Sequence, residues 1–147
     1  MKHSSSRDSA NRHGNGATRH AFQKADDPKP LQESKINGYH DEEMDKVEHA
    51  MPHGFTSVPL PPTGKGEDQQ SAESVVIYMG SNRSHGIVVV TDDRRYRLKK
   101  LKEGEIALYD DLGHQIHLTR DGIVVSVPQG KKIVQQVMDD DKMPQDS

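Results

Sequence analysis

The sequence contains no cysteine and no tryptophan, and only two of its 147 residues are phenylalanine. Without cysteine the chain cannot form a disulfide, a thiol nucleophile or a thiolate metal site. Hydrophobic residues make up 31% of the chain and charged residues 29%, which is poor material for a large core. We therefore expect one small domain, or one small domain with a fibrous extension, and some chain outside any packed core.

Long hydrophobic runs are absent as well. No apolar stretch approaches the roughly 20 residues that a membrane-spanning helix needs. The N-terminus lacks the hydrophobic region of a secretion signal. The net charge of −3 implies no bulk attraction to nucleic acid or to a membrane surface.

Motifs that carry catalysis are missing too. The sequence shows no nucleophile elbow, no dinucleotide fingerprint and no pair of catalytic carboxylates. His114 and His117 are three residues apart, and on a strand that spacing sends the two rings to opposite faces. We predict no catalytic residue, no cofactor, no metal and no enzyme activity.

What the sequence does contain is a regular alternation of apolar and polar residues through residues 105–137. This alternation predicts four short strands, separated by turns at residues 110–113, 120–122 and 128–130. One thin apolar face buries little by itself, and no helix pattern lies nearby to cover it. Packing on the upstream part of the same chain and assembly of several copies around an axis both remain open.

A second apolar region lies upstream. Residues 75–79 and 87–90 are apolar on both faces, which predicts a buried hairpin at the centre of a small barrel or sandwich. Residues 31–38 give a weaker strand signal, and residues 41–51 fit a helix or a polar edge strand equally well. His40, His49 and His53 lack a metal-binding spacing, so we interpret them as surface histidines.

The segment 94–102 is strongly basic. Six arginines and lysines are interleaved with Tyr96, a composition that could line a groove for single-stranded nucleic acid. An edge strand with a solvated basic face accounts for the same residues. We favour the edge strand and keep an OB-type nucleic-acid module that uses Arg94 to Lys102 as the alternative function.

Four blocks, in this order along the chain, resemble the phage Mu-type baseplate central spike family, also called baseplate assembly protein V. The resemblance covers about residues 20–127 and implies a structural protein at the tip of a contractile tail, driven through the host cell envelope. It also implies a homotrimer with an OB-fold-like barrel followed by a triple-stranded β-helix. The blocks are Gly54-Phe55-Thr56-Ser57-Val58-Pro59-Leu60, Ser81-Asn82-Arg83-Ser84-His85-Gly86, Asp92-Asp93-Arg94-Arg95-Tyr96-Arg97-Leu98 and Gly104-Glu105-Ile106-Ala107-Leu108-Tyr109-Asp110.

With this resemblance the predicted fold is all-β. It comprises a disordered polar tail (1–20), an OB-fold-like domain (21–102), the start of a short intertwined trimeric β-helix or prism (103–137) and a frayed acidic tail (138–147). The apolar side chains of the third segment then become the predicted interior of the trimer. They are Ile106, Leu108, Ile116, Leu118, Ile123, Val125 and Val127.

The resemblance also implies partners and a location. We expect a homotrimer that contacts tail hub and other baseplate proteins, without a small-molecule substrate or nucleic acid, in a virion tail assembled in the bacterial host cytoplasm. Spikes of this family end in an apex that binds iron through His-x-His, which this sequence lacks after residue 127. We therefore carry over no metal site. Truncation, degeneration or a separate tip-capping protein would each account for a chain that stops at Ser147.

Overall fold

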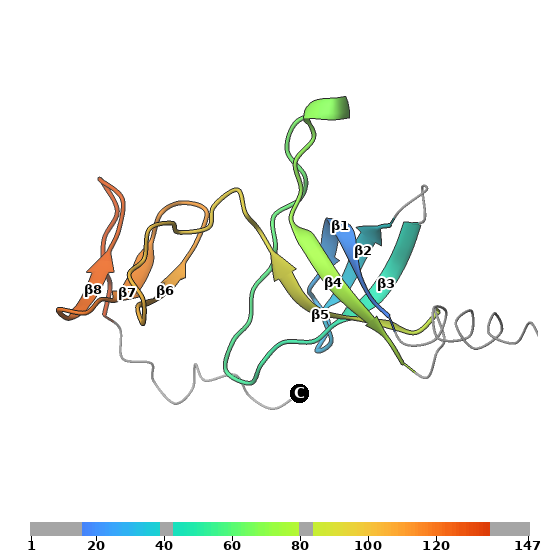
Figure 1. Ribbon diagram of the computed structural model, residues 1–147, viewed down its shortest axis with the longest axis horizontal. Helices are drawn as coiled ribbons and strands as arrows, with labels where there is room; N and C mark the ends of the chain where they lie inside the picture. The colour runs from blue at the N-terminus through green and yellow to red at the C-terminus, as the bar shows by residue number, and fades with distance from the viewer. Residues whose placement is uncertain (1–15, 39–42, 80–83, 136–147) are drawn as a thin grey trace, which may run out of the picture. The chain divides into compact units, whose positions relative to one another are not determined.

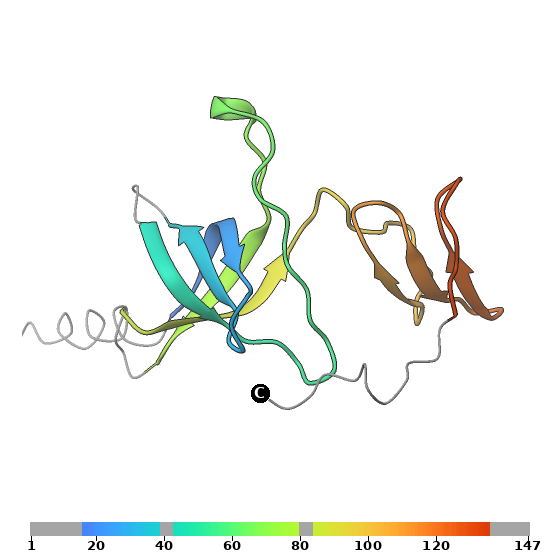
Figure 2. The ribbon, with the colours of Figure 1, turned by 180° about the vertical axis from the view of Figure 1, so that it is seen from behind.

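The computed structural model describes residues 16–38, 43–79 and 84–135. The chain divides into two compact units, residues 1–95 and 96–147, and each is described by itself. Both units are built from strands joined by turns and loops, as Figures 1 and 2 show from opposite sides. Within the described ranges no helix is long and apolar enough to cross a membrane.

The first unit is a closed five-stranded barrel. Its strands follow the order β1-β2-β3-β5-β4, and β4 closes the ring by pairing with β1. All neighbours are antiparallel except β3 and β5, which run parallel and pair through only Glu48–Ile87 and His49–Val88. This confirms the predicted all-β fold with a small OB-like barrel. The strands are β1 (Ala17–Asp26), β2 (Glu33–Asn37), β3 (Glu43–His49), β4 (Glu73–Tyr78) and β5 (Gly86–Asp92).

The barrel core is small, as the composition suggested. Alternate residues of each strand point inward, so that Val76 and Val88 are fully buried partners in the predicted β4–β5 hairpin. Polar groups share the interior with the apolar ones, because Ser34, Ser74 and His49 are also buried. The apolar core consists of Phe22, Ile36, Val47, Ala72, Val76 and Val88.

Several expectations upstream of the hairpin need correction. Strand β1 begins at Ala17, inside the segment expected to be a polar tail, because residues 17–21 pair with β4 and bury His20. Residues 43–49 form a strand, which is one of the two alternatives left open for this segment. His49 is only 6% exposed, so the surface interpretation of this side chain was wrong, whereas His53 is exposed. His40, most of the expected N-terminal tail and the C-terminal tail lie outside the described residues.

The basic segment is not the edge strand that we expected. Strand β5 ends at Asp92, residues 94–96 form a turn, and no strand follows before Ile106. The Asp93 carboxylate accepts a hydrogen bond from the backbone N–H of Arg95 at 3.2 Å, which turns the chain away from the ladder. Lys100 has a φ of 64°, which lies in the left-handed region of backbone conformation. The first unit accordingly ends at Arg95 rather than Lys102.

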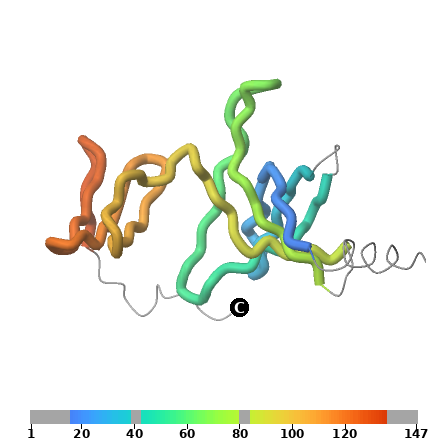
Figure 3. Tube along the Cα trace, viewed as in Figure 1, coloured from blue at the N-terminus to red at the C-terminus, as the bar shows by residue number. Residues whose placement is uncertain are grey.

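The second unit contains a three-stranded antiparallel sheet in the order β6-β7-β8, visible as the orange and red segments of Figure 3. The strands are β6 (Ile106–Tyr109), β7 (Gln115–Leu118) and β8 (Ile123–Ser126). Three of the four strands expected here are therefore present, with the predicted turns between them. Residues 131–135, where the fourth was expected to begin, contain no strand.

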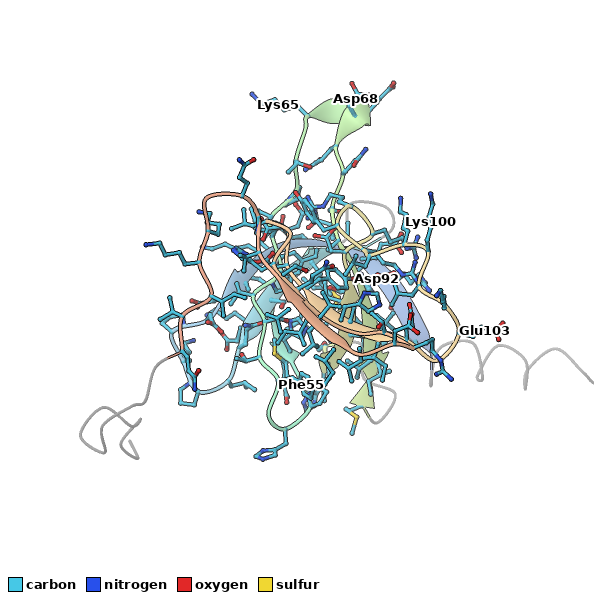
Figure 4. All side chains as sticks on the ribbon, turned by 90° about the vertical axis from the view of Figure 1, so that its left-hand side faces the viewer. Phe55, Lys65, Asp68, Asp92, Lys100 and Glu103 are labelled. Atoms are coloured by element: carbon cyan, nitrogen blue, oxygen red, sulfur yellow. The ribbon has the colours of Figure 1, made fainter. Side chains whose placement is uncertain are left out.

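A long connection between β3 and β4 projects from the barrel. Its outermost part carries the short 3₁₀ helix η1 (Gly66–Asp68). Figure 4 shows Lys65 and Asp68 at the end of this projection, away from the barrel strands. The projection contains Pro59, Pro61 and Pro62, followed by the polar residues from Thr63 to Gln70.

Candidate functional site

The strand register of the second unit gathers six of the seven predicted interior side chains on one face of the sheet. Residues directly opposite each other on neighbouring strands share a face. The β6–β7 and β7–β8 ladders therefore place on this single face, which we name the aliphatic face, the side chains of Ile106, Leu108, Ile116, Leu118, Ile123 and Val125.

Within the second unit, the aliphatic face is open to solvent. Exposure of its side chains ranges from 40% at Leu118 to 72% at Ile123. Isolated exposed aliphatic residues are common, whereas a contiguous set on one sheet face indicates a surface that another molecule covers. The predicted role of these residues as a trimer interior nevertheless stays a prediction.

Val127, the seventh predicted residue, follows the end of β8 and is half-buried. It lines a shallow hollow of about 310 Å³ together with Leu108, Ile116, Val125 and Ile133. The apolar surface thus continues past the sheet into the segment after Pro128. Ile133 itself is 64% exposed.

The opposite face of the same sheet is more polar. Gln115 donates a hydrogen bond from Nε2 to Ser126 Oγ at 2.9 Å, across the β7–β8 ladder. His117 lies on this face, paired with Ala107 on one side and Val124 on the other. The two faces of the sheet therefore differ in polarity. This difference fixes the strand register, because a slip of one residue would exchange the two faces.

Glu105 connects the turns beside the sheet through the hydrogen bonds of its carboxylate. Its side chain is 6% exposed, and its Oε2 lies 3.2 Å from His117 Nε2. The carboxylate also accepts hydrogen bonds from the backbone N–H groups of Lys102, at 2.9 Å, and Arg120, at 3.2 Å. These contacts, led by the Lys102 N–H, hold the pKa of Glu105 below its usual value. One carboxylate thereby joins the start of β6, the middle of β7 and the β7–β8 turn.

The two histidines of the second unit are engaged separately. His114 Nδ1 lies 2.6 Å from Asp110 Oδ2, while His117 contacts Glu105. Asp110 also accepts from the backbone N–H groups of Leu112 and His114, so this carboxylate organises the β6–β7 turn. Among the described residues no group of three or more potential ligands could hold a metal ion.

Two of the three arginines proposed for nucleic-acid binding, Arg94 and Arg95, contact carboxylates. Arg94 contacts Glu73 at 2.8 Å and Asp92 at 3.0 Å. The Arg95 side chain is 9% exposed and contacts Asp93 at 2.6 Å. No strand presents residues 94–102 as a groove, so no structural observation favours the nucleic-acid alternative.

Glu105 is the organising carboxylate that the sequence pattern did not indicate. Asp110 was correctly placed in a turn, because Asp and Gly neighbours mark turns. The contact of Glu105 with His117 spans twelve residues and depends on the strand register, which has no local signature in the sequence. The same holds for the contacts of Arg95 with residues 60–70.

Comparison with known proteins gives one family and two curated relatives. The family described as "Bacteriophage Mu Gp45, N-terminal" matches residues 19–95. The "Baseplate puncturing device gp45" of Escherichia phage Mu is 38% identical over 96 residues, which are 65% of this chain and 44% of that protein. The "Mu-like prophage FluMu protein gp45" of Haemophilus influenzae is 35% identical over 82 residues, 56% of this chain and 40% of that protein.

These comparisons support the family resemblance. The chain spans less than half the length of either curated relative. No solved structure matches it. The family match covers the barrel from β1 to Arg95, which is the part whose strand order is that of a small OB-like barrel. The chain belongs to the bacteriophage Mu Gp45 N-terminal family.

Proposed function

We propose that this protein is a structural component of a contractile phage tail baseplate, a central spike that helps to pierce the host cell envelope. The single observation that carries the proposal is the aliphatic face of β6-β7-β8, exposed in a chain of the Mu Gp45 family. A surface of this kind needs a cover, and further copies of the same chain are the simplest cover that symmetry offers.

The proposed assembly is a homotrimer. Around a threefold axis, residues 103–137 of three copies form an intertwined β-helix or prism, with the aliphatic face directed at the axis. Strands β6 and β8 each have one described strand neighbour, so each leaves an edge for pairing with another copy. The proposed interior consists of Ile106, Leu108, Ile116, Leu118, Ile123, Val125 and Val127.

Burial supplies the driving force for this assembly. Covering a side chain that is about half exposed contributes on the order of 1 kcal/mol, from the usual 1.5–3 kcal/mol for full burial of an aliphatic residue. Six such residues in each of three chains give roughly 20 kcal/mol, before the entropic cost of association is subtracted. Hydrophobic burial is therefore of the right order to hold three copies together.

The proposed role is mechanical rather than enzymatic. Interlocked strands satisfy one another's backbone hydrogen bonds and transmit axial force without exposing free edges. The name of the phage Mu relative, a baseplate puncturing device, supports this role and a location in the virion tail. Under this proposal the trimer assembles in the host cytoplasm and contacts tail hub and other baseplate proteins.

Size-exclusion chromatography with light scattering tests the trimer. The expected mass is three times the 16.4 kDa of one chain. A stable monomer at micromolar concentration would overturn the proposal, because the aliphatic face would then remain uncovered.

A further inference from the structure

The projection between β3 and β4 is held by hydrogen bonds rather than by a core. We name residues 59–71 the arm. Every residue from Thr63 to Gln70 is exposed, and none of them is aliphatic or aromatic. Figure 4 shows the end of the arm, marked by Lys65 and Asp68, standing clear of the barrel. Hydrophobic burial therefore contributes little to holding the end of the arm in place.

Backbone hydrogen bonds and restricted backbone conformations hold the two sides of the arm together instead. Thr63 and Gln70 exchange two backbone hydrogen bonds, each 2.8 Å long, across its two sides. Gly64 has a φ of 79°, and a Cβ atom there would lie 2.6 Å from the Asp68 carbonyl oxygen, so only glycine fits. Pro59, Pro61 and Pro62 further restrict the ascending side.

Arg95 ties both sides of the arm to the barrel. Its Nη1 donates to the carbonyl oxygens of Pro61, at 3.1 Å, and Gln70, at 3.3 Å, which lie on opposite sides of the arm. Its Nε and Nη2 hold the two oxygens of the Asp93 carboxylate at 2.8 and 2.6 Å. This pairing keeps the pKa of Asp93 below its usual value, so the carboxylate stays charged opposite the arginine.

Ordering an exposed segment in this way costs conformational entropy that the isolated chain does not recover. This cost favours binding of a partner, because a segment already held in its bound conformation loses less conformational entropy when the partner binds. Long ordered loops without a core are for this reason commonly binding elements.

We propose that the arm is a docking element that contacts a basic surface of another protein of the tail, and that Arg95 is the residue that positions it. The proposal rests on the baseplate role inferred above. The end of the arm presents the exposed carboxylates of Glu67 and Asp68 beside the single cation Lys65. Such an end suits lysine and arginine side chains of a protein, and it repels the phosphates of nucleic acid and of anionic lipid.

Charge reversal at the end of the arm tests the docking. The variant carries Glu67→Lys and Asp68→Lys, and the matched control carries Glu103→Lys and Asp121→Lys, two exposed positions of the second unit. Both variants change the net charge by the same amount. In tails purified from the phage that encodes the chain, we expect the arm variant to be incorporated at least tenfold less than the control. Equal incorporation of the two variants would overturn the proposal.

The same preparations separate this proposal from the baseplate role. If the wild-type chain is monomeric and missing from purified tails, the proposed function fails. If the wild type is trimeric and present, and the arm variant is incorporated equally well, only the arm proposal fails. Melting temperature and mass in solution, measured for each variant, show that neither charge reversal acts through unfolding.

Removal of the Arg95 guanidinium tests its positioning role. Arg95→Met is compared with Arg94→Met, which removes a neighbouring arginine that contacts Glu73 and Asp92 instead of the arm. We expect trypsin to cut after Lys65 at least tenfold faster in Arg95→Met than in Arg94→Met. Equal rates of cleavage in two folded variants would show that Arg95 does not hold the arm.

Discussion

Leu108 and Ile116 lie directly opposite each other on β6 and β7, and the two side chains are 50% and 43% exposed. An aliphatic cross-strand pair of this kind contributes most when a further layer covers it. Within the second unit, no described residue provides that layer on the exposed half of either side chain. Ile116 lies on the central strand of this face, between Leu108 and Val125, so a substitution there tests assembly directly.

Substitution Ile116→Asp is expected to abolish the trimer, because it would bring three carboxylates together on a dry axis. The matched control is Val124→Asp, on the opposite face of the same sheet, where the native side chain is 46% exposed. Light scattering should report a monomer for Ile116→Asp and a trimer for Val124→Asp. A trimeric Ile116→Asp protein would contradict the placement of the aliphatic face in the interior.

Substitution Glu105→Gln should lower the melting temperature of the second unit, because it removes the charge that accepts from Lys102, Arg120 and His117. The folded-state pKa of Glu105 is lowered, so its contribution is complete above the usual value of 4.5 and disappears as the pH falls through the lower folded value. Thermal unfolding followed from pH 7 to pH 3 checks this. The gap between wild type and variant should narrow in acid, and a constant gap would contradict the assignment.

The barrel should lose stability in mild acid through His49. This ring lies among Ser34 Oγ, at 3.1 Å from Nδ1, and Thr91 Oγ1, at 3.5 Å from Nε2, and burial lowers its pKa from 6.5. The unfolded chain therefore takes up the proton first. The contribution of neutral His49 is complete above about pH 6.5 and falls as the pH drops towards the folded value.

Urea unfolding at pH 7 and pH 5 measures this loss. We expect the free energy of unfolding to fall more between the two pH values in the wild type than in His49→Gln, which keeps a polar side chain but cannot titrate. An equal loss in both proteins would assign the acid sensitivity to other groups.

The two phenylalanines of the chain provide a matched pair for the core. Phe22 is fully buried and Phe55 is 60% exposed. Substitution Phe22→Ala is expected to cost about 3–5 kcal/mol of barrel stability through the cavity that it leaves. Substitution Phe55→Ala should stay within about 0.5 kcal/mol. Chemical denaturation of both variants checks the difference, and similar losses would mean that Phe22 does not anchor the core.

The sequence predicted the parts of this fold whose signal is local. The alternation of Ile116 and Leu118 with polar neighbours and the apolar run around Val76 both correspond to strands, because side-chain period and burial act on neighbouring residues. Strand β1 escaped notice because two of its inward residues, Thr18 and His20, are polar and, together with the exposed Arg19, resemble a polar tail. Its partners on β4 lie more than fifty residues away.

The candidate site was likewise predictable where the signal is local and unpredictable where it depends on long-range contacts. The alternation of Leu108, Ile116 and Val125 predicted that these side chains share one face, and the register confirms it. The side-chain hydrogen bonds of Glu105 and Arg95 could not be predicted. Glu105 and His117, like Arg95 and Pro61, become neighbours only after the chain has folded. The basic segment was misjudged for a related reason, since the Asp93 side chain captures Arg95 and ends the ladder.

The short parallel pairing of β3 with β5 is the seam at which we expect the barrel to open first. Only Glu48–Ile87 and His49–Val88 close the ring there, whereas the remaining seams are longer and antiparallel. A seam with fewer paired residues opens at a lower free-energy cost than the longer antiparallel seams of the same barrel. Amide hydrogens along that seam should consequently be the first of the barrel to exchange with solvent.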